Sequence, residues 1–169
     1  RNVVVNTSPG WMRLDQFTIR DFRDYGELDL AGILEKSSNI GMSRLALQLS
    51  DTAIWEKYHQ LGLGQAPGTG FPGESTGSLP APVRWSRSER AALSYGYGLS
   101  ASAVQIASAY TAIANNGERL QPSLLRLAEP PQGIPAISPT VANDLLNILE
   151  TSVAAYTGGR RARVEGYRV

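Results

Sequence analysis

The stretch LEKSSNIGMSRLA, residues 34–46, places two serines and an asparagine between two apolar segments. Short polar side chains at such a position commonly cap a helix, because they accept hydrogen bonds from its first free backbone N–H groups. The stretch therefore predicts a helix that begins near Ser38 or Asn39. A second interpretation is a Ser-x-Asn element, formed by Ser37 and Asn39, of a serine acyl-transfer site.

The second interpretation sets a condition on the backbone. Residues two apart point to the same side of an extended segment, but to nearly opposite sides of a helix at about 100° per residue. Ser37 and Asn39 can face one cleft only from a non-helical connection, so we expect a break between Lys36 and Ile40. Capping would supply that break, and the two interpretations are compatible. A hydroxyl can relay a proton, and a carboxamide can donate and accept hydrogen bonds at once.

Composition excludes several other kinds of site. The 169 residues suffice for one domain that buries roughly 70% of its unfolded surface, and the net charge of +1 gives no drive toward nucleic acid. The chain has no cysteine and a single histidine, His59, which rules out disulfides, thiolate chemistry and multi-His metal sites. We expect no cofactor and no metal. No apolar run approaches the ~20 residues that span a bilayer.

The flanking sequence predicts a mostly helical chain. Residues 13–21 are compatible with a short hairpin, and residues 28–34 with a brief helix. Helices are also predicted over 40–49, over 52–60, from Ser86 with its capping-box partner Glu89, and after Ser138. Residues 62–85, which hold many glycines and prolines, form a long loop of a kind that is often functional. The next helix should point Val104, Ile106, Ala109, Tyr110 and Ile113 inward.

Four stretches together resemble one family. They are SSNIGMSRLA (37–46), GFPGES (70–75), ERAALSYGYGLSASAVQIASAYTAIANNG (89–117) and RRARVEGYRV (160–169). Their order and spacing resemble the penicillin-binding peptidoglycan D,D-transpeptidases, in particular the division-specific class B type. The resemblance covers nearly the whole chain. It implies the α+β fold shared by serine transpeptidases and β-lactamases, of which residues 1–169 would be a mostly α-helical central segment, with the antiparallel sheet largely outside this chain.

The resemblance also implies roles for individual residues. The family uses three motifs: Ser-x-x-Lys with the nucleophile, Ser-x-Asn, and Lys-Ser/Thr-Gly. Ser37 and Asn39 match the second motif, so Ser37 would relay protons and Asn39 would hydrogen-bond the substrate amide and hold the catalytic lysine. Tyr97, in the turn SYGYG, is the expected cleft residue beside Tyr95, although both tyrosines can equally be packing aromatics.

The chain departs from the family pattern in two motifs. It contains no Ser-x-x-Lys, and YTGG at 156–159 has tyrosine where the third motif requires lysine. We therefore expect one transpeptidase domain that is truncated at both ends and inactive by itself. The expected partners are peptidoglycan stem peptides, β-lactams and division proteins, with no nucleic acid. The expected location is the periplasmic face of the inner membrane, with the anchor outside this chain.

Two alternatives stay open at this point. A β-lactamase or D,D-carboxypeptidase shares the fold and the Ser-x-Asn logic, and a non-catalytic β-lactam sensor or scaffold would also lack the other motifs. Among the remaining polar residues, Glu74 is expected to hold a loop and His59 to have no catalytic role. Arg160, Arg161 and Arg163 are expected to belong to a solvated loop.

Overall fold

The computed structural model describes residues 3–83, 85–154 and 164–166, which form two compact units. The first unit comprises Arg1–Asp51, Arg84–Tyr97 and Asn147–Val169, and the second comprises Thr52–Val83 and Gly98–Leu146. Arg160, Arg161 and Arg163, which were expected in a solvated loop, lie outside the described residues.

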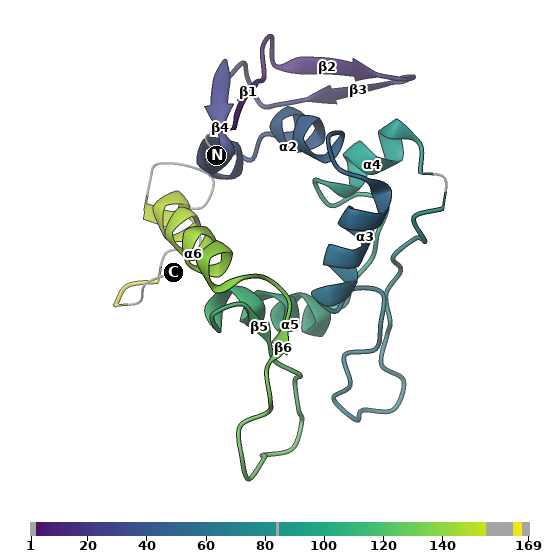
Figure 1. Cartoon of the computed structure of the whole chain (residues 1–169), viewed down its shortest axis with the longest axis vertical. Coiled ribbons are helices and arrows are strands. Elements are labelled where there is room, and N and C mark those ends of the chain that lie inside the picture. Colours follow the sequence, from purple (N-terminus) through teal and green to yellow (C-terminus); the bar gives the residue numbers. More distant parts are fainter. Residues whose placement is uncertain (1–2, 84, 155–163, 167–169) are drawn as a thin grey trace. The chain divides into compact units, whose positions relative to one another are not determined.

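Strands dominate the start of the first unit (Figure 1). β1 (Val4–Asn6) pairs antiparallel with β4 (Glu27–Asp29), and β2 (Trp11–Leu14) pairs antiparallel with β3 (Phe17–Arg20). Three short helices complete the part of this unit that matters for the site: α1 (Leu30–Glu35), α2 (Asn39–Ala46) and α4 (Arg87–Leu93).

The β2–β3 hairpin confirms the prediction for residues 13–21. Leu14 pairs with Phe17 across a two-residue turn, in which Asp15 adopts a φ of 54°. Alternation along the two strands turns Leu14 and Ile19 inward, where they are 5% and 7% exposed. Both residues join a core with Ile40 of α2 and Ala91 of α4. The hairpin is therefore packed directly on the helix that follows the Ser-x-Asn residues.

Close packing of α1 on α2 depends on Gly41. A Cβ at this position would lie 2.7 Å from Cγ1 of Ile33, which is fully buried. Such a distance is shorter than real Cβ contacts allow, so glycine is required for the two helices to approach this closely. The packing holds the end of α1 against the start of α2 and fixes the short connection between them.

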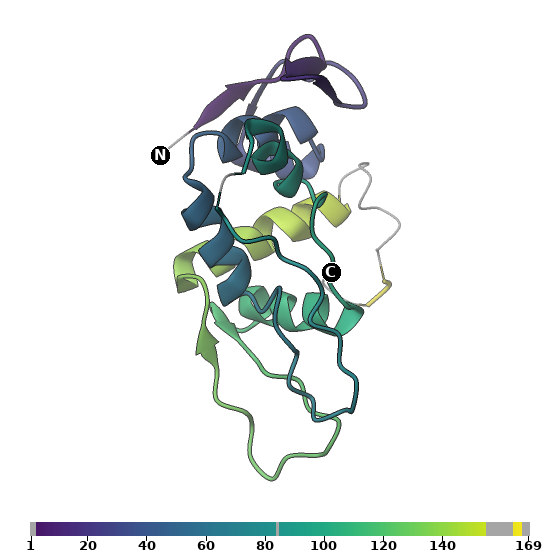
Figure 2. The same ribbon diagram turned by 90° about the vertical axis from the view of Figure 1, so that its right-hand side faces the viewer.

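The second unit contains α3 (Asp51–Gln60, whose first residue belongs to the first unit), α5 (Ala103–Ala114), and the strands β5 (Glu118–Arg119) and β6 (Ile134–Pro135). α6 (Pro139–Ala154) is divided between the units, and its start is capped by the Ser138 hydroxyl, as predicted. Long connections without helices or named strands run over residues 61–83 and 120–133 (Figure 2). They are joined where Gln121 Nε2 donates to the Gly68 carbonyl at 2.9 Å.

The predicted inward face of α5 is wrong at three of its five positions, while Ala109 and Ile113 are half-buried. Val104, Ile106 and Tyr110 are 42%, 43% and 56% exposed, whereas Gln105, Ser108 and Ala112 are buried. The reason is hydrogen bonding: Gln105 Nε2 donates to the carbonyls of Gln65 and Thr76, both at 2.9 Å, and the Ser108 hydroxyl donates to the Leu120 carbonyl at 2.8 Å. These loop carbonyls need buried donors, which the side chains of Gln105 and Ser108 supply, and Ala112 completes the buried stripe without a donor.

The Gly-rich loop is held together by Glu74, as expected. Its carboxylate accepts hydrogen bonds from the backbone N–H groups of Gly68 and Thr69 and from the Thr69 hydroxyl. The hydrogen bond from the Thr69 side chain, followed by the backbone donors, lowers the pKa of Glu74. Within the described residues no helix combines the length and the apolar character needed to cross a membrane.

Candidate active site

The connection between α1 and α2 consists of Lys36, Ser37 and Ser38. The Ser37 N–H donates to the Leu34 carbonyl at 3.1 Å, and the Ser38 N–H donates to the Ile33 carbonyl at 2.9 Å. This pair of bonds is a Schellman motif, in which the residue after the C-cap takes a left-handed conformation and is usually glycine. Here that residue is Ser37, with a φ of 53°. The expected break is present, but it is short, because Asn39 is already the first residue of α2.

Ser38, and not its two neighbours, caps α2. Its hydroxyl accepts from the Gly41 N–H at 2.9 Å and donates to Asp21 Oδ2 at 2.6 Å. The side chain is fully buried. The other carboxylate oxygen of Asp21 accepts from the Ile40 N–H at 3.0 Å. The free N–H groups of Gly41 and Ile40 at the start of α2 are thus satisfied by one local hydroxyl and by one carboxylate that follows β3.

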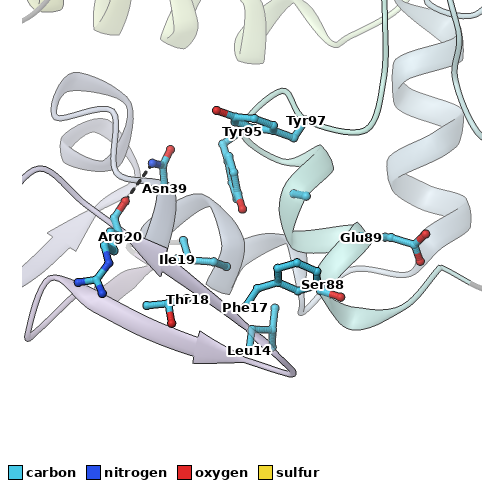
Figure 3. Close-up of a pocket in the computed structure, with 11 residues that line it drawn as sticks. Leu14, Phe17, Thr18, Ile19, Arg20, Asn39, Ser88, Glu89, Tyr95 and Tyr97 are labelled. Carbon is cyan, nitrogen blue, oxygen red and sulfur yellow. Dashed lines mark hydrogen bonds between the residues drawn. The ribbon is translucent and has the colours of Figure 1, made fainter.

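The side chain of Asn39 is not needed to cap α2. Its Nδ2 donates to the Arg20 carbonyl at 3.0 Å, and the side chain makes no capping bond in the described structure. The dashed line in Figure 3 marks this bond, and the amide oxygen of Asn39 points away from Arg20. The half-buried carboxamide lines a pocket of about 430 Å³.

The pocket lies within the first unit and is mostly apolar at its base. Leu14, Phe17 and Ile19 of the hairpin form one side, and α4 with the following turn forms the other (Figure 3). Asn39 and Tyr97 are both lining residues, so two of the three predicted site residues come together. Ser37 is exposed and is not among the lining residues of this pocket.

The two tyrosines have different positions. Tyr95 is half-buried and packs against the core, whereas Tyr97 is 69% exposed, and their rings meet edge to face with centroids 5.6 Å apart. Burial, and secondarily the neighbouring Tyr97, raises the pKa of Tyr95 above its ordinary value of 10.0. Tyr95 thus packs against the core and also lines the pocket, whereas the ring of Tyr97 is the more exposed of the two lining tyrosines.

Sequence reasoning missed the residues that orient this site. Asp21 and the Arg20 carbonyl lie 17 and 19 residues before their partners, and no local motif marks them. His59 is exposed and stacks on Trp55 with ring centroids 4.8 Å apart, and in the described part of the chain no group of acidic, His or Cys side chains could hold a metal ion.

A family model described as the penicillin binding protein transpeptidase domain matches residues 1–169. The probable peptidoglycan D,D-transpeptidase PbpC of Pseudomonas aeruginosa is 40% identical over 168 residues, covering 99% of this chain and 30% of PbpC. The peptidoglycan D,D-transpeptidase FtsI of Escherichia coli is 36% identical over 168 residues, covering 99% of this chain and 28% of FtsI. The chain therefore spans less than a third of either curated relative.

Solved structures agree with the sequence comparison. The apo TP domain of Burkholderia pseudomallei penicillin-binding protein 3 superposes with a TM-score of 0.93 at 42% identity, covering 99% of this chain and 51% of that one. A structure described as a peptidoglycan glycosyltransferase from Burkholderia ambifaria has a TM-score of 0.94 at 40% identity, with 99% and 54% covered. The predicted fold class is confirmed: this chain belongs to the family of penicillin-binding protein transpeptidase domains.

Proposed function

We propose that this chain is part of a peptidoglycan D,D-transpeptidase that is acylated by β-lactams, and that Ser37 and Asn39 serve as the Ser-x-Asn element of its active site. Family membership and relatives named as D,D-transpeptidases support the activity. One observation carries the assignment of the residues: Ser38 and Asp21 perform the capping, so neither the Ser37 hydroxyl nor the Asn39 carboxamide is needed to start α2.

The backbone at Ser37 supports the same assignment. A non-glycine residue in the left-handed region costs roughly 1–2 kcal/mol, and such strain concentrates at functional positions. Glycine would fit the Schellman motif better, and serine adds nothing but a hydroxyl and this strain. A requirement for the hydroxyl explains the choice. Because Ser37 is exposed, that hydroxyl is free to act outside the packed core.

The proposed chemistry is acyl transfer through a serine ester. A nucleophilic serine attacks the carbonyl of the penultimate D-Ala of a stem peptide, and the terminal D-Ala leaves with a proton as the ester forms. The amine of a second stem then attacks the ester, which forms the cross-link and frees the serine. Since these 169 residues contain no Ser-x-x-Lys, the nucleophile and its lysine come from other parts of the protein.

In this scheme Ser37 relays a proton to the amine of the leaving D-Ala, and later relays a proton away from the attacking amine of the second stem. Asn39 hydrogen-bonds the substrate amide and helps to hold the lysine, and Tyr97 contributes an aromatic surface at the rim of the pocket. We further propose the division-specific role, a location on the periplasmic face of the inner membrane, and contact with other division proteins. The similarity to FtsI supports these three proposals.

Labelled penicillin tests this function on the full-length protein. We expect a stable covalent adduct with the wild type and a loss of acylation rate of about 100-fold in Asn39→Ala, a size typical of losing one positioned hydrogen-bonding group. Asn143→Ala, which changes an exposed asparagine on α6, is the matched control and should keep the wild-type rate. Absence of any adduct would refute the proposed function, and rapid turnover of the adduct would indicate a β-lactamase instead.

A further inference from the structure

The end of β3 makes three hydrogen bonds to three consecutive residues at the start of α2. Asp21 accepts from the Ser38 hydroxyl at 2.6 Å and from the Ile40 N–H at 3.0 Å. Between these two contacts, the Arg20 carbonyl accepts from Asn39 Nδ2 at 3.0 Å. The two neighbours of Asn39 in the chain are thus bound to Asp21, and the side chain of Asn39 is bound to the adjacent Arg20.

The hairpin end is itself fixed. Arg20 pairs with Trp11 in the β2–β3 ladder, and the Asp21 N–H donates to the Gly10 carbonyl at 3.0 Å. On the other side of the contact, Ser38 is fully buried. A charged carboxylate bonded to a buried hydroxyl is among the stronger hydrogen bonds in proteins. The position of Asn39 is therefore set by Asp21 more firmly than by its own exposed contact with Arg20.

This contact also determines which way round the Asn39 amide lies. A backbone carbonyl can only accept, so the Arg20 carbonyl must face Nδ2, and Oδ1 is directed elsewhere (Figure 3). One N–H and the carbonyl oxygen of the amide are left for a ligand. The group that meets Oδ1 must be a hydrogen-bond donor, such as a peptide N–H or an ammonium group.

We infer that Asp21 is a positioning residue of the active site: through Ser38 and Ile40 it holds the start of α2 so that Asn39 presents Oδ1 as an acceptor to the substrate amide or the catalytic ammonium. This inference rests on the proposed function of Asn39. Misplacement of a reacting group by about 1 Å can cost two orders of magnitude in rate. Loss of the Asp21 carboxylate should consequently slow acylation and not only weaken the fold.

Acylation of the full-length protein by labelled penicillin tests the inference with four variants. Asp21→Ala removes the positioning carboxylate. Asp29→Ala is the matched control, because Asp29 caps α1 by accepting from the Gly32 N–H at 2.8 Å and is not one of the residues that hydrogen-bond the start of α2. Asn39→Ala and the double variant Asp21→Ala/Asn39→Ala show whether the effect of Asp21 passes through Asn39.

We expect Asp21→Ala to lower the acylation rate constant about tenfold or more, since positioning errors act on the reacting geometry, and Asp29→Ala to change it by about twofold or less. In the Asn39→Ala background, the loss of Asp21 should have no further effect on acylation. An equal rate loss in Asp21→Ala and Asp29→Ala, or an equal loss with and without Asn39, would overturn the inference alone. A wild-type rate in Asn39→Ala would overturn the proposed function and this inference with it.

Asp21→Asn keeps the test decisive if Asp21→Ala does not fold. The asparagine retains the shape of the side chain and one acceptor for the Ile40 N–H, but it loses the charge and reverses the bond to the Ser38 hydroxyl. We expect the acylation rate of Asp21→Asn to lie between those of the wild type and Asn39→Ala. Asp29→Asn is the control and should stay close to the wild-type rate. Wild-type acylation in a folded Asp21→Asn variant, with its altered bond to Ser38, would also contradict the inference.

Discussion

α2 begins differently from α4 and α5. The starts of α4 and α5 are capped from their own sequence: Ser86 and Glu89 form one capping box, and Ser102 and Gln105 form another. α2 also begins with a local cap, Ser38, but the residue three positions later is Gly41, which has no side-chain acceptor. Asp21, 17 residues before Ser38, supplies an acceptor instead. The two ordinary starts need nothing from the rest of the chain. The start of α2 depends on the hairpin, and this dependence leaves the side chains beside its cap available for chemistry.

The largest effect on stability should come from Ser38→Ala. This change removes the cap and also leaves Asp21 Oδ2 without its buried partner, so we expect a loss of about 2 kcal/mol. Ser86→Ala, at an exposed capping box, should cost about 1 kcal/mol or less. Thermal melting of the two variants measures the difference. Equal losses would mean that the long-range contact to Asp21 adds nothing to the local cap.

A smaller loss of stability is expected from Gly41→Ala, which tests the packing of α2 against α1. The added methyl would clash with buried Ile33 at a cost of about 1–3 kcal/mol, and the better helix propensity of alanine offsets about 1 kcal/mol of it, so we expect a net loss of about 1 kcal/mol. Gly32→Ala in α1 is the comparison: there a Cβ would lie 3.2 Å from the side chains of Leu28 and Asp29, a milder conflict than the 2.7 Å approach to Ile33. The melting temperature should fall more for Gly41→Ala than for Gly32→Ala. The reverse order would show that the α1–α2 connection is not fixed by this contact.

The smallest effect concerns pH and the capping box of α4. Hydrogen bonding from the Ser86 side chain, and then from its backbone, lowers the pKa of Glu89 below its ordinary value of 4.5. A lowered folded-state pKa means that this stabilisation is present above 4.5 and is lost as pH falls through the folded-state value. Hydrogen exchange of the 86–93 segment should therefore be slower in the wild type than in Glu89→Gln at neutral pH, and equal in both at strongly acidic pH. A constant difference at all pH values would contradict the assignment.

Local patterns explain which features could be predicted. The hairpin, the Ser86–Glu89 box and the Ser138 cap all follow from neighbouring residues, and all three are confirmed. The face of α5 could not be predicted, because buried loop carbonyls select Gln105 over the more apolar side chains around it. Asp21 could not be found either, since nothing in the local sequence ties a residue of β3 to the start of α2.

The site itself was predicted only in part. Ser37 and Asn39 could be selected from the family resemblance, and the break that they require follows from helix geometry. The structure adds that Ser37 is the left-handed residue of a Schellman motif. Serine is not the usual residue at that position, so its conformation could not be deduced from sequence. The roles of Ser37, Asn39 and Tyr97 in catalysis remain predictions.

The most direct measurement combines melting and penicillin acylation of Ser37→Gly in the full-length protein. Glycine relieves the left-handed strain, so we expect melting to rise by the equivalent of about 0.5–1 kcal/mol. Acylation should fall, because the hydroxyl is gone, and Ser37→Ala should lose acylation equally without the gain in stability. Higher melting together with a wild-type acylation rate would contradict the account, since Ser37 would then be only the end of a helix.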